Sequence, residues 1–571
     1  MMKSRLWVFR DIDLTHRANL AQGLSISTVT ASLLVARGVT TLAQASSWMS
    51  HCLSHDPFLI PDMGRAIERL HQAVRSYESI CFYGDYDVDG MSATSLYLSF
   101  FRSLGAQVRA YVPHRQREGY GLNVHAIEQL HAGGVTLLVT SDCGTTSHRE
   151  IARAASLGMD VIVTDHHQTE DMMPSAVAIM NPHRSDAQYP FKGLCSAGLA
   201  YKVAQAYVMR YGEAGIPLES LLDLVALATI ADVVPLHDEN RGYVRDGLAQ
   251  LSRGARCGIR ALKQVAGVVR DCTAETIAFK LAPRLNAAGR LDHAMLGIQL
   301  LTTESAAEAQ ELAERLERLN RERQKIEAGM MAEAVELATQ QEAPSALVLA
   351  SRRWHVGVVG IIAARLVDRF HCPAIAIAID ETGVGKGSAR TTGNFDLYQG
   401  LAACRDLLDA FGGHPSAAGV TIQEFRLDQF RARFEDVART WAINGRSVPT
   451  LHIDAELRLS DVTTKLIKEI GALHPFGAGN PEPTFAVKRL EVMDARTVGD
   501  KHLKLTVRQQ GSVPFDTIGF GMKSLMDRGI ASRVPVDLAF IPELNHWNGY
   551  DRIQLRLRDL RPSADESHYD A

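Results

Sequence analysis

The sequence lacks the patterns that mark secreted, membrane-spanning and zinc-ribbon proteins. Its eight cysteines are widely scattered and none forms a CxxC pair, so neither a disulfide framework nor a zinc ribbon is expected. The N-terminal stretch MMKSRLWVFRDIDL has no apolar core like that of a signal peptide. No uninterrupted apolar run is long enough to span a bilayer. These absences favour a cytoplasmic protein that has no membrane partner.

The chain also lacks a large excess of charge of one sign. Its net charge is −4 and its pI is near 6.6, so any surface that binds nucleic acid must be a local patch. The 571 residues, of which 46% are hydrophobic, suffice for several domains with their own cores. We find no internal repeat and no low-complexity tract.

Residues 61–300 alternate short apolar runs with helical stretches. The runs SICFYGD, VTLLVTSD, MDVIVTDHH and AVAIMNP each end in a polar loop. This alternation predicts βαβ units around a buried parallel sheet. Ligands of such sheets bind at the carboxyl ends of the strands, and the first three runs end in aspartate, or in aspartate and histidine. Residues 1–60 look helical and carry no recognisable chemistry.

Three further regions and a tail follow. Residues 301–343 keep apolar side chains at helical spacing, which predicts an amphipathic helix. It either packs on a single domain or connects two lobes, and we favour the connection. Residues 344–445 read as a second α/β unit, and residues 446–562 alternate apolar and polar residues like a small β-barrel. The tail, residues 563–571, is expected to be disordered.

The stretch CFYGDYDVDG places three aspartates within five residues at the end of a predicted buried strand. Clustered carboxylates raise one another's pKa unless a cation neutralises them, and hard divalent cations prefer oxygen ligands. If the backbone stays extended, the side chains of Asp85, Asp87 and Asp89 share one face. We expect Gly90 to let the chain turn tightly into the next helix.

Further candidate ligands recur at later element ends. Asp142 lies in TSDCGT, Asp165, His166 and His167 lie in VTDHHQT, and Asp232 ends a buried helical run. Histidine ligands move the preference towards manganese or similar ions. Each motif alone has a plainer explanation, such as a turn or a helix N-cap. The whole set offers enough ligands for two ions, an arrangement that suits phosphoester hydrolysis.

These motifs resemble those of the DHH phosphoesterase superfamily and, within it, the RecJ family of bacterial exonucleases. GDYDVDG, SDCG, TDHH and IADVVPL resemble its metal-site motifs, and APRLNAAGRL, GSAR, GGHPSAAG, PFGAGNPEP and LNHWNGYDRIQLRL resemble later segments. The resemblance covers nearly the whole chain. It implies an α/β fold with a parallel-sheet DHH catalytic domain, a second α/β DHH-associated domain joined by a long helix, and a C-terminal OB-fold β-barrel.

The resemblance also implies an activity. It is that of a single-stranded-DNA-specific 5′→3′ exonuclease that hydrolyses phosphodiester bonds with two Mg²⁺ or Mn²⁺ ions and releases 5′-mononucleotides. The implied setting is DNA repair and recombination, including mismatch repair. Single-stranded DNA is the implied substrate, a single-strand-binding protein and a RecQ-type helicase are partners by family analogy, and we expect a monomer.

The site residues implied by the resemblance fall into two sets. The metal ligands are Asp85, Asp87, Asp89, Asp142, His166, His167 and Asp232, of which Asp142, bridging both ions, His166 and His167 are also catalytic. The substrate-binding residues are Arg117, Arg284, Arg290, Ser388, Arg390 and His414.

The expected anion site lies in the second lobe. We expect Ser388 and Arg390 beside a glycine-rich turn, and His414 at a glycine-rich helix start, where they would hold the 5′ phosphate of the DNA end. Arg115, like Arg117, follows a predicted strand, and a solvated surface arginine is an equally good interpretation of each. Trp547 and Tyr550 would either stack on bases or pack in the barrel core.

Two other functions remain open from the sequence. The first is a phosphodiesterase for short oligonucleotides or cyclic dinucleotides, against which the length and the additional β domain argue. The second is a non-catalytic binding module that keeps the fold, against which the complete set of ligand motifs argues.

Overall fold

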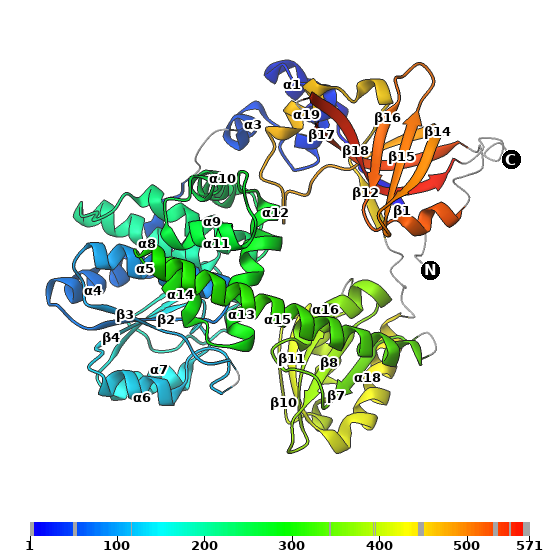
Figure 1. The fold of residues 1–571 in the computed structure, drawn as a ribbon. Helices are drawn as coiled ribbons and strands as arrows, with labels where there is room; N and C mark the ends of the chain where they lie inside the picture. The colour runs from blue at the N-terminus through cyan, green and yellow to red at the C-terminus, as the bar shows by residue number, and fades with distance from the viewer. Residues whose placement is uncertain are drawn as a thin grey trace. The chain divides into compact units, whose positions relative to one another are not determined.

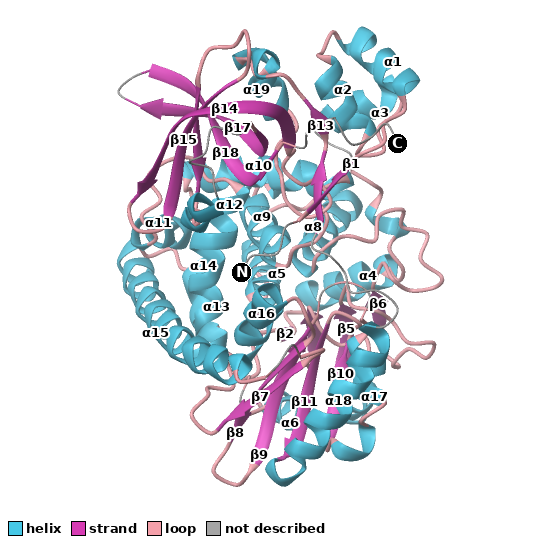
Figure 2. Cartoon of the chain, turned by 90° about the vertical axis from the view of Figure 1, so that its right-hand side faces the viewer, coloured by secondary structure: helices cyan, strands magenta, loops and turns pink. Residues whose placement is uncertain are grey.

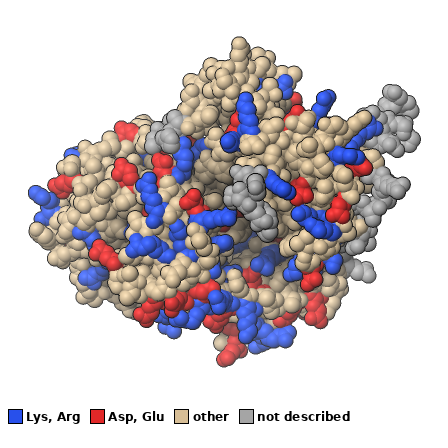
Figure 3. All heavy atoms as spheres, turned by 45° about the horizontal axis from the view of Figure 1, so that its top comes forward, with Lys and Arg blue, Asp and Glu red and all other residues tan. Residues whose placement is uncertain are grey.

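The computed structural model describes residues 5–49, 54–115, 117–341, 344–391, 393, 395–442, 450–528, 535–547 and 550–563. The chain forms two compact units (Figure 1). The first contains Ser54–Val234 and Glu239–Ser447, and the second contains Met1–Leu53, Pro235–Asp238 and Val448–Ala571. Among the described residues, no helix combines the length and the apolar character that crossing a membrane requires. Basic and acidic side chains are interspersed on the face drawn in Figure 3, in keeping with the small net charge.

A five-stranded parallel sheet forms the core of the first unit, in the order β3-β2-β4-β5-β6. Its strands are β2 (Ile80–Gly84), β3 (Val108–Tyr111), β4 (Leu137–Ser141), β5 (Asp160–Thr164) and β6 (Ala178–Met180). Every residue of β2 and β4 is buried, as expected for a sheet that is covered on both faces. The chain passes from β2 to β3 at one edge and then crosses back to β4, so β2 lies at a topological switch point, where ligands of such sheets bind.

Helices cover both faces of this sheet because alternate strand residues point in opposite directions. Phe82 stacks on Tyr97 and Phe101 of one helix, whereas Cys81 and Tyr83 pack in a core with residues of two others. The helices of this lobe are α4 (Met63–Arg75), α5 (Val88–Ser103), α6 (Val124–Ala132), α7 (His148–Ser156), α8 (Ser196–Tyr211), α9 (Leu222–Ala231), α10 (Asp238–Arg253), α11 (Cys257–Val265), α12 (Ala274–Thr276), α13 (Ala282–Leu291) and α14 (Met295–Thr302).

The long helix α15 (Ala306–Thr339) leads from this lobe to a second lobe in the same unit (Figure 2). Its first half packs against α11, α13 and α14, and its second half packs against α16 (Val359–Phe370) and β7 (Leu347–Ser351). The helix therefore connects the two lobes, as we favoured from the sequence, and it also packs on the core of each lobe.

The second lobe is built on a mixed sheet in the order β10-β11-β9-β8-β7. Only the pair formed by β7 and β8 is parallel. The remaining elements are β8 (Ala374–Ile379), β9 (Val384–Arg390), α17 (Leu397–Ala402), β10 (Ala410–Gly413), β11 (Ala417–Gln423) and α18 (Leu427–Ala442). Side chains of α17 and α18 fill one side of this sheet, and those of α15 and α16 fill the other.

Two local predictions about the second lobe are wrong. The GSAR segment lies inside strand β9 rather than beside a turn. A Cβ at Gly385 or Gly387 would lie 2.8 or 2.7 Å from the Ile377 side chain, so the glycines of this strand serve close packing and not a turn. His414 lies in the turn of the β10–β11 hairpin rather than at a helix start, since its amide and carbonyl both bond to Ala417.

The second unit contains the C-terminal strands and the N-terminal residues. Strand β14 pairs with both β15 and β17, so β14-β15-β16-β18-β17 close into a ring. The elements are β1 (Leu6–Phe9), α1 (Leu14–Leu24), α2 (Thr28–Val35), α3 (Leu42–Met49), β12 (Thr450–Ile453), β13 (Ala455–Glu456), α19 (Thr464–Gly471), β14 (Phe485–Val498), β15 (His502–Arg508), β16 (Phe515–Gly519), β17 (Val536–Trp547) and β18 (Tyr550–Pro562).

The sequence suggested that the N-terminal residues are helical, but they also form a strand. Strand β1 pairs in parallel with β12, from Leu6 opposite Thr450 to Phe9 opposite Ile453. Residues of α1–α3, among them Leu20 and Leu34, share a core with α19 and the ring strands. A strand whose partner lies this far along the chain has no local turn signal, which is why the sequence did not reveal it.

Candidate metal centre and groove

The predicted ligand side chains converge at the carboxyl end of the parallel sheet. Asp85 follows β2, Asp142 follows β4, and His166 and His167 follow β5. Asp232 reaches the same place from the C-terminal end of α9. Because parallel strands end at the same edge, three segments far apart in sequence bring their charged side chains together.

The potential ligand atoms form three overlapping groups, each within 4.8 Å. The groups are Asp85, Asp87 and Asp142; Asp142, His166 and His167; and Asp89, His166 and Asp232. Asp142 and His166 each belong to two groups. An arrangement that overlaps in this way offers enough ligand atoms for two cations.

The backbone does not stay extended as far as Asp89, because α5 begins at Val88, so the condition under which the three carboxylates would share one face is not met. Asp87 is the N-cap of α5, and its Oδ1 accepts hydrogen bonds from the amides of Asp89 (2.9 Å) and Gly90 (3.1 Å). Asp89 already lies in the first helical turn, so the three carboxylates separate into two ligand groups. Asp87 itself is extended, as is usual for an N-cap residue, and the helix starts directly after it.

Gly90 serves close packing rather than a tight turn. A Cβ on this residue would lie 2.6 Å from both the amide nitrogen and the carbonyl oxygen of Asp85. Glycine therefore lets the first turn of α5 rest directly on the backbone that carries Asp85.

The N-terminus of α8 holds Asp89, an interaction that the sequence analysis missed. The amides of Ser196 and Ala197 donate to the two oxygens of the Asp89 carboxylate, at 2.7 and 2.8 Å. The Ser196 hydroxyl also donates to Asp142 Oδ1 (3.0 Å). A helix N-terminus favours negative charge and here fixes two ligand carboxylates. The small residues in GLCSAG before a helical stretch were the available signal.

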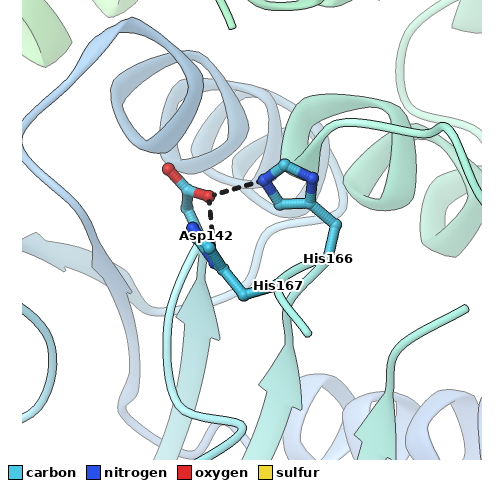
Figure 4. Close-up of side chains that lie close together, drawn as sticks. All are labelled: Asp142, His166 and His167. Carbon is cyan, nitrogen blue, oxygen red and sulfur yellow. Dashed lines mark hydrogen bonds and ion pairs between the residues drawn. The ribbon is translucent and has the colours of Figure 1, made fainter. Parts of the chain in front are cut away.

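Asp142 lies at the centre of the cluster (Figure 4). Its φ of 71° is in the left-handed region, and the Tyr120 hydroxyl donates to its carbonyl oxygen (2.9 Å). The Nε2 atom of His166 lies 3.1 Å from Asp142 Oδ1, 3.6 Å from Asp89 Oδ2 and 3.7 Å from Asp232 Oδ2. His166 thus joins ligands that come from three different elements.

Asp165 orients His167. Its Oδ1 lies 2.7 Å from His167 Nδ1, and its Oδ2 accepts a hydrogen bond from the Thr145 amide (3.0 Å). Such a carboxylate fixes the tautomer and the orientation of an imidazole and leaves Nε2 as the nitrogen for a ligand or substrate. Burial opposes protonation of His167, but the hydrogen bond to Asp165 prevails and raises the pKa of His167 to about 9.

The cluster carries negative charge that the described residues leave only partly compensated. Burial, reinforced by neighbouring carboxylates, raises the pKa of Asp85 and Asp142 well above the usual range and raises that of Asp232 to about 8. Burial also raises the pKa of Asp89 and lowers that of His166. Asp85 Oδ1 is buried and has no hydrogen-bond partner within the described part of the chain. Buried carboxylates of this kind fit divalent cations, which supply the missing positive charge.

A groove of about 1300 Å³ runs between the two lobes of the first unit and reaches this cluster. It is lined by Tyr86, Arg115, Tyr120 and His167 from the first lobe and by Lys386, Ser388, Arg390 and His414 from the second. The rings of His167 and His414 lie parallel with centroids 6.5 Å apart. The groove therefore brings cationic side chains of one lobe opposite the carboxylates of the other.

The predicted substrate-binding residues do not all lie in this groove. Ser388, Arg390 and His414 line it, and Arg390 donates to the Ser388 hydroxyl (2.7 Å). Arg115, which also lines it, stacks 4.7 Å above the ring of Tyr86, an aromatic side chain that the sequence analysis did not single out.

The other three predicted arginines are not among the residues that line the groove. Arg117 is exposed, and Arg284 forms an ion pair with Glu317 (2.6 Å) on α15. Arg290 donates to the carbonyl of Gly357 (3.1 Å), which joins the two lobes. The side chains of Trp547 and Tyr550 lie outside the described part of the structure, so the stacking prediction stays a prediction.

Three family models match the chain. They are the DHH family N-terminal domain over residues 79–229, the DHHA1 domain over residues 343–440 and the RecJ OB domain over residues 453–559. Among curated proteins, the single-stranded-DNA-specific exonuclease RecJ of Bacillus subtilis is 39% identical over 99% of this chain and 72% of its own length. The protein of the same name from Dickeya dadantii is 37% identical over 93% of this chain and 95% of its own length.

The fold agrees with these matches. The crystal structure of Thermus thermophilus RecJ in complex with Mn²⁺ is similar with a TM-score of 0.85 and 29% identity, covering 98% of this chain and 80% of that chain. The same protein in complex with Mg²⁺ matches with a TM-score of 0.80. Sequence and structure agree over nearly the whole length, and the chain belongs to the RecJ family.

Proposed function

We propose that this chain is a metal-dependent exonuclease that digests single-stranded DNA from its 5′ end and releases 5′-mononucleotides. One observation carries the proposal: a buried carboxylate–histidine cluster opens onto a groove whose other side presents Lys386, Ser388 and Arg390. Nuclease chemistry needs a site for cations beside a site for a phosphate backbone. The relatives named single-stranded-DNA-specific exonuclease support the choice of substrate.

The cluster would hold two Mg²⁺ or Mn²⁺ ions. Asp85, Asp87 and Asp142 form one ligand group, and Asp89, His166 and Asp232 form the other. Bound ions of this type supply Lewis-acid stabilisation of the attacking and leaving oxygens in phosphodiester hydrolysis. The complexes of the Thermus thermophilus protein with both metals support this assignment.

His167 would act on the substrate beside the ions. Asp165 holds Nδ1 of His167, which leaves Nε2 for the substrate, and raises the pKa of the imidazole in the metal-free protein. In its protonated form His167 can donate a hydrogen bond from Nε2–H to a phosphate oxygen and stabilise charge that develops there. His414, whose ring lies parallel to that of His167, would border the same phosphate from the second lobe.

Ser388 and Arg390 would hold the 5′ phosphate of the strand. Two residues apart on β9, they present their side chains on the same face of the sheet, and the guanidinium and hydroxyl are donors suited to a phosphate. A phosphate held at a fixed place beside the ligand cluster would limit cleavage to the terminal nucleotide. This is what makes an exonuclease rather than an endonuclease.

Membership of the RecJ family also suggests a role for the OB domain, an oligomeric state, a cellular setting and protein partners. We propose that the RecJ OB domain binds the single strand by backbone and stacking contacts. We further propose that the protein works as a monomer in the cytoplasm, in DNA repair and recombination that includes mismatch repair, with a single-strand-binding protein and a RecQ-type helicase. Family membership alone supports these partners and this setting.

We predict that Asp142→Ala abolishes hydrolysis and leaves single-strand binding largely intact. Loss of the carboxylate shared by two ligand groups removes several kcal/mol of charge stabilisation, about 10³-fold or more in rate. Turnover in Mn²⁺ and filter binding of a labelled oligonucleotide measure the two properties. Asp186→Ala, in an exposed carboxylate paired with Arg184, is the control and should keep both. Retained turnover in Asp142→Ala would refute the metal assignment.

We predict that affinity for Mn²⁺ rises with pH between about 6 and about 8. Carboxyls whose pKa is raised in the metal-free protein, such as Asp232 at about 8, must lose protons when the ions bind. Each released proton makes the Mn²⁺ affinity rise by as much as about tenfold per pH unit. Calorimetry in buffers of different ionisation enthalpy measures both affinity and proton release. Asp232→Asn should release fewer protons.

The same groups give the metal-free protein an opposite pH dependence. A carboxyl with a raised pKa in the folded state binds more protons folded than unfolded, so its contribution to stability falls as pH rises from about 4 to about 8. The unfolding temperature without metal should therefore decrease over this window, and Mn²⁺ should reverse the decrease. A pH-independent Mn²⁺ affinity without proton release would contradict this account of the site.

We predict that Arg390→Met weakens the preference for a 5′-phosphorylated strand. Loss of a charge-assisted hydrogen bond costs about 1.5–3 kcal/mol, or about 10- to 100-fold in kcat/KM, and a 5′-hydroxyl strand should be affected far less. Competition between the two strands measures the ratio. Arg284→Met, which removes an arginine paired with Glu317, should leave the ratio unchanged. Equal losses on both strands in Arg390→Met would count against the phosphate site.

A further inference from the structure

Two glycines, one within the first lobe and one between the lobes, contact neighbouring backbone too closely to carry a side chain. A Cβ at Gly289 on α13 would lie 2.4 Å from the carbonyl oxygen of Tyr86, and one at Gly357 would lie 2.3 Å from that of Arg290. Neither has a positive φ, so the close approach, and not an unusual conformation, requires glycine at both places.

A third glycine extends these contacts to the phosphate-binding strand. A Cβ at Gly360, in the first turn of α16, would lie 3.2 Å from Ser388 Oγ and 3.4 Å from Arg390 Nη2. Gly289, Gly357 and Gly360 are called the glycine joint below. Tyr86 at its one end stands between the ligands Asp85 and Asp87.

The joint forms a continuous path within the first unit. Tyr86 rests on Gly289, the next residue Arg290 rests on Gly357, and Gly360 rests on Ser388 and Arg390. The Arg290 side chain closes the middle contact by donating to the Gly357 carbonyl (3.1 Å). Close-packed backbone transmits displacement with little compliance, unlike the ends of flexible side chains.

The geometry points to a role in positioning: the glycine joint fixes the distance between the metal-ligand loop and the Ser388–Arg390 strand, so that a terminal phosphate held by this strand places the first phosphodiester bond at the ligand cluster. This inference rests on the function proposed above. Binding energy from a remote anchor accelerates the reaction only when the anchor and the reacting centre are held at a fixed separation. A misplacement of about 1 Å can cost about 100-fold in rate.

Gly357→Ala tests the inference most strongly. The new Cβ must move away from the Arg290 carbonyl oxygen, which is a backbone atom, by roughly 1 Å to reach ordinary contact. We expect the advantage of a 5′-phosphorylated over a 5′-hydroxyl strand to fall by about 100-fold in kcat. Cleavage of the 5′-hydroxyl strand, which does not use the anchor, should change little.

Two further variants make the test specific. Gly329→Ala on α15 is the matched control, because a Cβ there meets nothing within 4 Å; it should keep the wild-type preference. Gly360→Ala is the milder variant, because its neighbours are side-chain ends that can give way, and it should lower the preference by a smaller factor. It carries the test if Gly357→Ala does not fold, as judged by thermal unfolding.

The outcomes separate the joint from the proposed function. Single-turnover cleavage of both strands in Mn²⁺, with Mn²⁺ affinity measured alongside, should show lost preference and unchanged metal binding in the joint variants. If the wild type digests neither strand, the proposed function fails. If the wild type prefers the phosphorylated strand and the joint variants keep that preference, or lose both activities equally, the joint inference is overturned.

Discussion

Mutual repulsion among buried carboxylates is the constraint on which the rest of the structure depends. Asp85, Asp89 and Asp142 lie in the interior at the edge of one sheet, where burial and like charge raise their pKa. The protein moderates the repulsion with fixed dipoles, as the α8 amides do at Asp89 and as the Ser196 hydroxyl does at Asp142. Among the described residues, Asp85 Oδ1 has no hydrogen-bond partner. Divalent cations complete the charge balance, and this requirement ties the fold to the chemistry.

The second lobe supplies the side of the groove that faces the carboxylate cluster. A metal cluster alone would hydrolyse any phosphodiester that reached it, so selectivity must come from what borders it. The sheet of the second lobe presents Ser388 and Arg390 to the same groove, and α15 contributes to the cores of both lobes. The contacts at Gly289 and Gly357 place this border on rigid backbone. Charge and distance together, rather than either alone, would define where the strand is cut.

Much of this could be predicted from the sequence, and the failures have physical causes. The parallel sheet, and the aspartate and histidine side chains that the structure brings together after β2, β4 and β5, follow from apolar runs that end in aspartate or histidine, a local signal. The hydrogen bonds from the α8 amides to Asp89 were missed because backbone N–H groups are the same in every non-proline residue and leave no mark in the sequence. The glycines of GSAR suggested a turn and those of GGHPSAAG a helix start, but the first segment lies in a strand and the second forms a hairpin. Strand β1 escaped notice because its partner β12 is far away in sequence.

The central claim is that cleavage begins at the 5′ end of a single strand and depends on the metal cluster. The most direct measurement digests one oligonucleotide, labelled at its 5′ or its 3′ end, in Mg²⁺ and in Mn²⁺, with a blunt duplex as the control. The account predicts that the 5′ label appears at once as a mononucleotide, that the 3′-labelled strand shortens progressively, and that the duplex is spared. Cleavage of dinucleotides without digestion of the long strand, or shortening that starts at the 3′ end, would contradict it.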